Sequence, residues 1–196
     1  MTRKLFRKKI LLSLLITGSL IGTTWALTKP TFTETFAPLS PVSCEGLKLD
    51  GVSYSFTVAG APSLDCNART SAGPGNTNHI QSPNIEGTSA GVLHLVLDAP
   101  TTEFSFGVAR SLVSPPPPFP PVPDSVIVDL FRPGAGLLRD HLLLDPTNDP
   151  LFVGGQFNYE GPAVKTVTIS FTTPPLTRFA IDNVTYFRPP GQQCVN

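Results

Sequence analysis

The chain has 196 residues, with 14 Lys+Arg against 14 Asp+Glu, 22 Pro, 16 Gly and 3 Cys. Beyond the first nine positions its basic residues form no cluster, which excludes a nucleic-acid-binding surface because such a surface must neutralise phosphates. The frequent Pro and Gly exclude long helices and predict many short strands separated by turns.

The N-terminus has the features of a secretory signal peptide. Five basic residues stand in the first nine positions, an apolar run extends over residues 10–22, and Thr24-Trp25-Ala26 offers a cleavage site. The run of about 13 residues is shorter than the roughly 20 that span a bilayer. We expect residues 1–26 to be removed near Ala26 and the mature chain, without a membrane span, to be secreted, periplasmic or exposed at the cell surface. Removal takes five basic residues and no acidic one, so 9 Lys+Arg face 14 Asp+Glu and the net charge becomes −5.

The first part of the mature chain predicts two short stretches of sheet. Residues 31–36 alternate polar and apolar side chains, which predicts a strand that ends at Pro38. Residues 46–60 contain a turn signal at Asp50-Gly51 followed by another alternating run, which predicts a hairpin with one buried face. The expected buried side chains are Tyr54, Phe56 and Val58.

A long loop is predicted over residues 61–90, which are rich in Gly, Pro, Asn and Ser. Loops of this length inside a compact domain are uncommon unless they carry a function or cover the core. The loop is therefore the first place to look for a binding site, and we take Asn76, Asn78 and Glu86 as candidate ligand-binding residues.

The rest of the chain predicts a series of short strands and no amphipathic helix. Residues 114–123 are Pro-rich and predict a stiff polyproline loop, which cannot join a sheet interior. The whole pattern predicts a single all-β domain over residues 27–196, a two-sheet β-sandwich of jelly-roll type, with the first and last strands side by side. Residues 91–110 predict a pair of strands that turn at Asp98-Ala99-Pro100. Further strands are expected over residues 124–132, 137–144, 163–172 and 176–187.

Three cysteines, Cys44, Cys66 and Cys194, allow one disulfide and leave one thiol over. Cys44 and Cys66 are closest in sequence, but a simple hairpin turning at residues 60–62 would place Cys66 opposite Ser55, far from Cys44. The pairing is open at this point. The cysteines lack the spacing of a zinc site.

One motif raises the question of catalysis. Gly87-Thr88-Ser89-Ala90-Gly91 matches the G-x-S-x-G nucleophile elbow, with Asp129 and His141 as formal partners for Ser89. The elbow requires a strand before it and a helix after it, whereas a strand is predicted to follow here, so we expect a turn entering a strand. None of the histidines, His79, His94 and His141, has metal-site spacing. We predict no catalytic residue.

A calcium ion is the one cofactor that we consider. Glu34 and Asp182 lie on the expected first and last strands, and carboxylates are ligands that Ca²⁺ prefers. If those strands pair, the two side chains can share an ion. The alternative is that the Asp182 carboxylate accepts a hydrogen bond from a neighbouring backbone amide.

Several phrases resemble a loose group of exported bacterial β-sandwich proteins, many of which carry a PEP-CTERM sorting tail. They are GVSYSFTVAGAPSLD, GPGNTNHIQSPNIEGTSAGVLHLVL, FSFGVA and RFAIDNVTY. The resemblance implies a jelly-roll-like domain at the cell surface or in an extracellular matrix, and it supplies no catalytic residues. Because this chain ends in GQQCVN, we expect secretion or periplasmic residence without that sorting route.

The expected function is that of an exported, non-catalytic β-sandwich that binds a surface polysaccharide or another envelope ligand. The long loop and the absence of a catalytic set favour it, although the tyrosines available for sugar stacking are only Tyr54, Tyr159 and Tyr186. A secreted esterase or glycosidase, using Ser89 or a pair of carboxylates, is one alternative. A structural component of the matrix is another.

Overall fold

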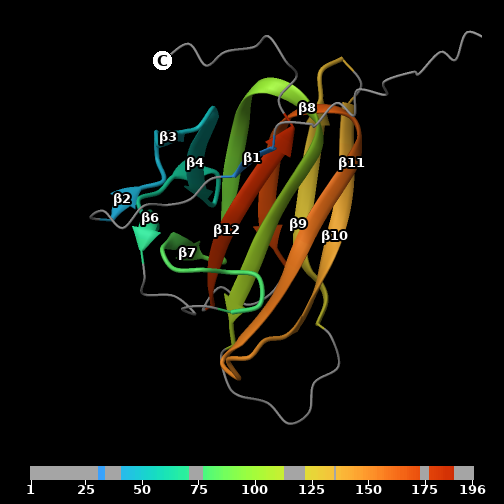
Figure 1. Ribbon diagram of the computed structural model, residues 1–196. Coiled ribbons are helices and arrows are strands. Elements are labelled where there is room, and N and C mark those ends of the chain that lie inside the picture. The colour runs from blue at the N-terminus through green and yellow to red at the C-terminus, as the bar shows by residue number, and fades with distance from the viewer. Residues whose placement is uncertain are drawn as a thin grey trace, which may run out of the picture.

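The computed structural model describes residues 31–33, 41–70, 77–112, 122–134, 136–172 and 177–187. These residues form twelve antiparallel strands, and no helix occurs among them (Figure 1). No helix able to cross a membrane is found in this part of the chain. The strands are β1 (Thr31–Thr33), β2 (Val42–Ser43), β3 (Lys48–Leu49), β4 (Val52–Val58), β5 (Ala61–Pro62), β6 (Cys66–Thr70), β7 (Asn84–Thr88), β8 (Gly91–Ser111), β9 (Val122–Arg132), β10 (Gly136–Pro146), β11 (Phe152–Phe171) and β12 (Arg178–Phe187).

Two long strands divide this assembly into two layers. The first half of β8 pairs with β4 on one side and with the second half of β11 on the other. The second half of β11 also pairs with β9, and β9 pairs with β10. The second half of β8 pairs with β12 and with the first half of β11. We call the layer containing β10, β9 and β4 the β9 sheet, and the layer containing β12, β7, β6 and β2 the β12 sheet. The predicted all-β sandwich is confirmed.

The change of layer occurs where β8 and β11 both arch over at the top of Figure 1. On β8 the arch contains Asp98-Ala99-Pro100, the predicted turn. On β11 the register with β8 shifts between Glu160, Val164 and Thr166, next to Pro162. The turn residues therefore bend two continuous strands instead of separating short ones, because each strand keeps its partner through the bend.

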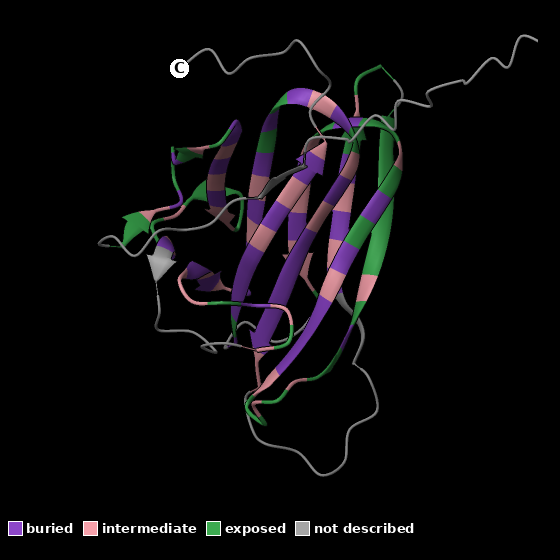
Figure 2. Ribbon diagram, in the orientation of Figure 1, coloured by how far each residue is buried: buried purple, intermediate pink, exposed green. Residues whose placement is uncertain are grey.

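Alternating side chains fill the space between the layers. Along much of both sheets, inward positions are buried while their neighbours stay exposed or half-buried, so Figure 2 shows many strands banded. Residues 106–110 of β8 and 179–182 of β12 are instead buried on both faces. Each fully buried Phe or Leu contributes about 1.5–3 kcal/mol. The largest of these buried side chains include Phe56, Leu93, Leu95, Leu97, Phe104, Phe106 and Phe179.

The hairpins and terminal strands largely follow the sequence predictions. Leu49 pairs with Val52 across the Asp50-Gly51 turn. Tyr54 and Phe56 are buried as expected, whereas Val58, at the end of β4, is only half-buried. β1 pairs with β12, so the first and last strands lie side by side. Most of the Pro-rich segment lies outside the described residues, but Val122 and Pro123 already belong to β9.

Two strand predictions were incomplete. The segment predicted as a loop over residues 61–90 contains β5, β6 and β7, which are short and polar and gain their partners only from the sheet edge. The strand predicted over residues 163–172 is the second half of β11, whose first half begins at Phe152.

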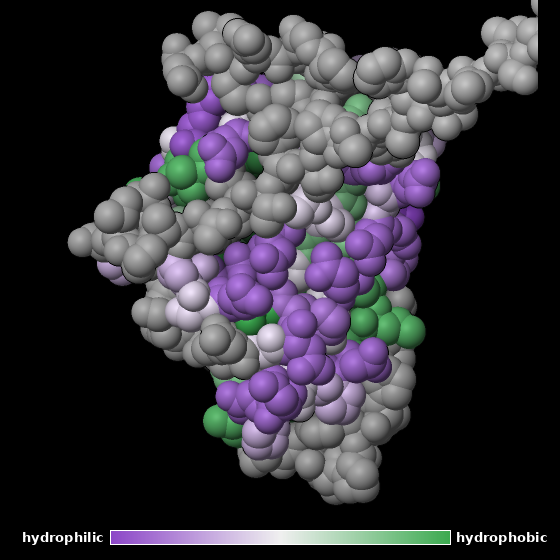
Figure 3. Space-filling model, in the orientation of Figure 1, coloured by the Kyte–Doolittle hydropathy of each residue, from purple (hydrophilic) through white to green (hydrophobic). Residues whose placement is uncertain are grey.

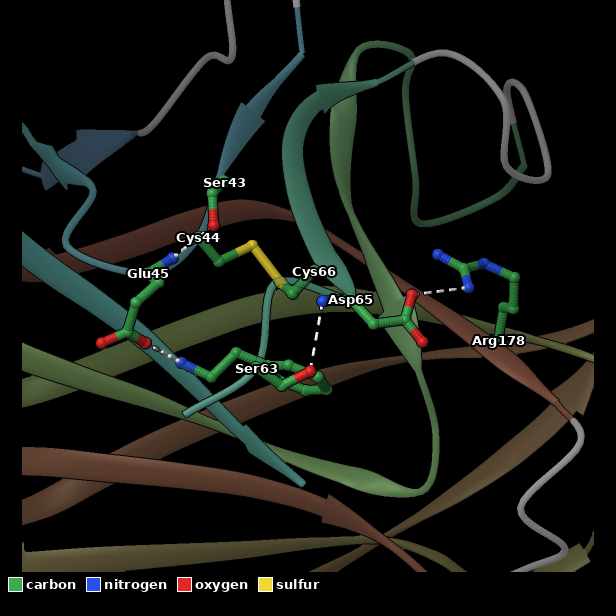
Figure 4. The surroundings of a disulfide bond; sticks show 8 residues. Ser43, Cys44, Glu45, Ser63, Asp65, Cys66 and Arg178 are labelled. Atoms are coloured by element: carbon green, nitrogen blue, oxygen red, sulfur yellow. Dashed lines mark hydrogen bonds and ion pairs between the residues drawn. A yellow bond between two sulfur atoms is a disulfide. The ribbon is translucent and has the colours of Figure 1, made fainter. Parts of the chain in front are cut away.

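The disulfide joins Cys44 to Cys66, with 5.4 Å between their Cα atoms (Figure 4). The hairpin argument against this pair was wrong. The β4–β5 hairpin ends at the Thr57–Pro62 pair, and the chain then crosses to the β12 sheet, where Cys66 lies opposite Gly87. There β2 pairs with β6, and the amide of Cys44 donates to the carbonyl of Cys66. Cys194 lies outside the described residues.

Candidate binding site

A cleft of about 330 Å³ lies on the β12 sheet where β11, β8 and β12 run side by side, close to the arch. Figure 3 shows hydrophilic side chains gathered over the strands of this sheet that face the viewer in Figure 1. The volume falls within the range of small-ligand sites. The cleft is lined by Glu103, Phe104, Ser105, Asn158, Tyr159, Glu160, Thr185, Tyr186 and Phe187.

The strand registers arrange the polar lining in rows. Glu160 on β11 lies directly opposite Glu103 on β8. One step further along, Asn158, Ser105 and Thr185 form a row across all three strands, and the hydroxyls of Ser105 and Thr185 hydrogen-bond each other. Directly opposite residues point to the same face of a sheet. The cleft therefore presents carboxylates, an amide and hydroxyls together.

The aromatic residues beneath these rows are held by hydrogen bonds. The Tyr186 hydroxyl donates to the carbonyl of Asp50 at 2.7 Å, and the Tyr159 hydroxyl donates to the carbonyl of Pro162 at 2.5 Å. Burial raises the pKa of Tyr159, although the charge of Arg132 opposes the shift, so this phenol keeps its proton at neutral pH. The floor of the cleft is thus fixed and uncharged.

The segment of residues 77–83, which we call the covering loop, lies against the same face. The carbonyl oxygen of His79 sits over Gly107, where a Cβ atom would approach it to 1.9 Å. Ile80 is fully buried against Ala109 and Ala180 of the sheet. Gly107 is two residues along β8 from Ser105, so the covering loop borders the cleft.

Of the candidate ligand residues of the loop, the two that the structure describes, Asn78 and Glu86, do not line this cleft. Asn78 is exposed on the covering loop. Glu86 lies on β7, where its carboxylate accepts a 2.6 Å hydrogen bond from Arg178, which also contacts Asp65 at 3.0 Å (Figure 4). Desolvation lowers the pKa of Arg178, but the two carboxylates outweigh this effect and raise that pKa above its ordinary value. Asn76 lies outside the described residues, and a ligand role for all three stays a prediction.

Asp182 is buried under the covering loop and anchors it. Its carboxylate accepts the N–H of Gln81 at 2.8 Å. Burial raises the pKa of Asp182, while hydrogen bonds from the backbone amides of Gln81 and Asn183 act in the opposite direction. Glu34 lies outside the described residues, so its sharing of a calcium ion with Asp182 stays a prediction. No group of three or more His, Cys, Asp or Glu suited to a metal is found among the residues that the structure describes.

The nucleophile-elbow motif runs from the end of β7 through a turn at Ser89-Ala90 into β8, so a strand follows it as expected, but a strand also precedes it. Ser89 is buried, and its hydroxyl donates to the carbonyl of Thr177 at 2.7 Å, so it is not presented to a substrate. Asp129 is held by Arg139 on the neighbouring strand at 2.7 and 2.9 Å. His141 is exposed on β10, opposite Ile127.

The other histidines lie apart from the cleft lining. On the outer face of the β9 sheet, Nε2 of His94 forms a 3.0 Å hydrogen bond with the hydroxyl of Thr57. Desolvation lowers the pKa of His94, and the nearby Glu45 carboxylate raises it in part. His79 belongs to the covering loop.

No protein-family model matches the sequence, and no curated protein matches it significantly. Similar solved structures include a family 29 carbohydrate-binding module, 9% identical with a TM-score of 0.33, over 69% of this chain and 88% of that one. Another is the CBM22-1 xylan-binding domain of Paenibacillus barcinonensis Xyn10C, 11% identical with a TM-score of 0.36, over 75% and 91% of the two chains. A third comprises the CBM22-1–GH10 modules of Clostridium thermocellum Xyn10B with xylohexaose, 12% identical with a TM-score of 0.34, over 79% of this chain and 28% of that chain. These likenesses are distant in both sequence and fold.

Sequence reasoning named Tyr159 and Tyr186 but missed the polar residues that line the cleft. Glu103 and Ser105 occupy the outward phase of a correctly predicted strand, but nothing in the sequence distinguished them from other polar strand residues. The alternation Phe157-Asn158-Tyr159-Glu160 was an available signal for the first half of β11. Reading it as a strand would have placed Asn158 and Glu160 on one face.

Proposed function

We propose that the protein acts outside the cytoplasm as a non-catalytic module that binds a polysaccharide in the cleft of the β12 sheet. The observation that carries the proposal is the row of Asn158, Ser105 and Thr185 beside the Glu103–Glu160 pair. Sugars present many hydroxyls, and carboxylate, amide and hydroxyl groups are the side chains that accept from and donate to them. Phe187, half-buried at the rim, adds an apolar surface for a sugar ring.

Export is the second part of the proposal, supported by the predicted signal peptide and by the disulfide, which persists in oxidising compartments. Mass spectrometry of the protein recovered from culture medium and periplasm should show a chain that begins after Ala26 and contains a Cys44–Cys66 disulfide. A full-length, reduced product confined to the cytoplasm would contradict it.

Binding is tested by calorimetry of the mature chain with soluble polysaccharides. Xylan, xylohexaose and cellulohexaose, the ligands named for similar structures, are the first to use. Asn158→Ala should weaken binding about tenfold, since one hydrogen bond of about 1–1.5 kcal/mol is lost. Thr168→Ala, on the outer face of the β9 sheet, is the matched control and should bind normally. Failure of every polysaccharide in a broad panel would end the proposal.

A glycosidase is the second candidate, because the structure does place two carboxylates directly opposite each other. Retaining and inverting glycosidases both use such pairs. Glu160 is exposed and Glu103 only half-buried, whereas a general acid at neutral pH usually needs a carboxyl group shielded from water. Binding is therefore favoured. Release of reducing sugar by the purified protein, abolished equally by Glu103→Gln and Glu160→Gln, would favour the enzyme instead.

A further inference from the structure

A buried carboxylate without a counter-charge lies beneath the covering loop. Asp182 is 4% exposed, and its carboxylate accepts the N–H of Gln81. The ion pairs of the described residues involve other carboxylates, those of Asp65, Glu86, Asp98 and Asp129. An ionised carboxylate removed from water is costly unless a charge or several hydrogen bonds compensate it. Two backbone amides provide only part of that compensation.

A second buried polar group follows the same loop and has no hydrogen-bond partner among the described residues. Asn84 at the start of β7 is fully buried, and within the described part of the chain neither its Oδ1 nor its Nδ2 has a hydrogen-bond partner. Ile181 of β12 lies opposite Ile85 of β7, and continuing that register by one residue sets Asp182 opposite Asn84. Opposite residues share a face, with their Cβ atoms about 4.5–5.5 Å apart. On this register the unpaired amide and the buried carboxylate lie on adjacent strands and on the same face of the β12 sheet, and Asn84 directly follows the covering loop in the chain.

Backbone oxygen is available at the same place. Asp182 also lies opposite Gly107 of β8, and the carbonyl of His79 sits directly over Gly107. The Asn183 side chain donates to that carbonyl at 3.4 Å, which ties the covering loop to β12. A carboxylate, an amide oxygen and a carbonyl are the ligand types of hard cations.

We propose that Asp182 and Asn84 bind a Ca²⁺-type cation beneath the covering loop, with the carbonyl of His79 as a further oxygen ligand and water completing the shell. The proposal keeps Asp182 from the sequence analysis and takes Asn84 as the second side chain. The cation neutralises the buried carboxylate, satisfies the orphaned amide oxygen and fixes the loop that borders the cleft. It does not depend on the identity, or the existence, of a polysaccharide ligand.

Thermal unfolding of the intact mature chain provides the first test. Addition of CaCl₂ after EDTA treatment should raise the Tm by roughly 5–10 °C when Ca²⁺ reaches about 100 times its dissociation constant. Asp182→Asn keeps an acceptor for the Gln81 amide but removes the charge, and it should abolish the shift. Asp65→Asn, which removes an exposed carboxylate at Arg178, is the control and should keep it. An unchanged Tm of the unsubstituted protein, or an equal shift in Asp182→Asn, overturns the proposal.

Equilibrium dialysis with ⁴⁵Ca²⁺ provides a test that does not depend on unfolding. One ion should bind per chain, and the neutral substitution Asn84→Ala should weaken binding at least tenfold. Asn84→Ala is also the variant to use if Asp182→Asn fails to fold. Binding at unchanged affinity in Asn84→Ala, or no binding to the unsubstituted protein, overturns the proposal.

Discussion

At the scale of single residues, the face of the β12 sheet is shaped by small side chains. Ala109 and Ala180 leave room for Ile80, and Gly107 leaves room for the backbone of His79. Larger side chains at these positions would occupy the volume of the covering loop. The absence of side-chain atoms beyond Cβ at these three outward positions is thus what lets the loop lie against the sheet beside the cleft.

Gly107→Ala should displace the covering loop, because a Cβ atom would lie 1.9 Å from the carbonyl oxygen of His79, a backbone atom that cannot rotate away. We expect a loss of about 1–3 kcal/mol in the free energy of unfolding, typical of overpacking. Urea denaturation measures it, and hydrogen exchange should show faster exchange at Gln81. Ser105→Ala, at the next outward position of β8, is the control. An Ala variant as stable as the parent would show that the loop does not rest on Gly107.

His94 should make the protein less stable in mildly acidic solution. Because desolvation lowers the pKa of His94 in the folded state, the unfolded chain binds a proton more readily between that lowered value and the ordinary value of about 6.5. Stability contributed by neutral His94 is therefore present above pH 6.5 and falls as pH drops through this window. Comparing denaturation midpoints of the parent and His94→Gln between pH 5 and 7.5 isolates the effect. The prediction fails if the two proteins lose stability in parallel.

At the scale of elements, β10 is an edge strand with an unusual amount of exposed apolar surface. Among the described strands, its residues 136–144 pair with β9 alone. Leu137, Leu138 and Leu143 are 48%, 37% and 50% exposed. An open edge of this kind invites pairing with another chain unless charged residues oppose it. The exposed Arg139-Asp140-His141 segment in the middle of the strand supplies such residues.

Asp140→Asn should therefore increase self-association of the mature chain. In an antiparallel pair of two β10 strands centred on residue 140, Leu137 meets Leu143 and Leu138 meets Leu142, while the two Asp140 carboxylates face each other. Removing the repulsion leaves the apolar pairs. Sedimentation velocity at increasing concentration should show more dimer or larger species for Asp140→Asn than for the parent. Asp149→Asn, in the turn after β10, is the control, and equal association of all three proteins would contradict the prediction.

At the scale of the whole molecule, the two layers share two strands. β8 and β11 each run from one sheet into the other while staying paired with each other. Separating the two layers from each other would break the β8–β11 pairing, which runs through both of them. Neither sheet can therefore unfold without disrupting strands of the other. We therefore expect the sandwich to fold and unfold as one unit.

Unfolding should follow a single cooperative transition. Native-state hydrogen exchange tests this most directly, because the slowest amides of β9 in one sheet and of β12 in the other should open with the same free energy. A difference of more than about 2 kcal/mol between the two sheets at low denaturant, or two separate calorimetric peaks, would show that the layers unfold independently.

The sequence by itself determined the fold class and which face of several strands is buried. The period-two alternation at Tyr54-Phe56 and Phe104-Phe106 predicts which side chains are buried. Turn residues such as Asp50-Gly51 predict where the chain reverses direction. Both signals are local, so they can be read from neighbouring residues. The same signals failed at β6 and β7, whose few polar residues become strands only because a sheet edge offers them partners.

Only the tertiary structure decided the cleft, the disulfide partner and the surroundings of Asp182. Each depends on how segments distant in sequence are placed against one another: Glu103 with Glu160, Cys44 with Cys66, and Asp182 with Gly107 and the covering loop. Register is set by how two layers of side chains pack and by where β8 and β11 bend, and many registers satisfy the same alternating pattern. The alternating pattern of a strand therefore predicts that a polar residue lies on the outer face, but it does not predict which residues of other strands lie next to it.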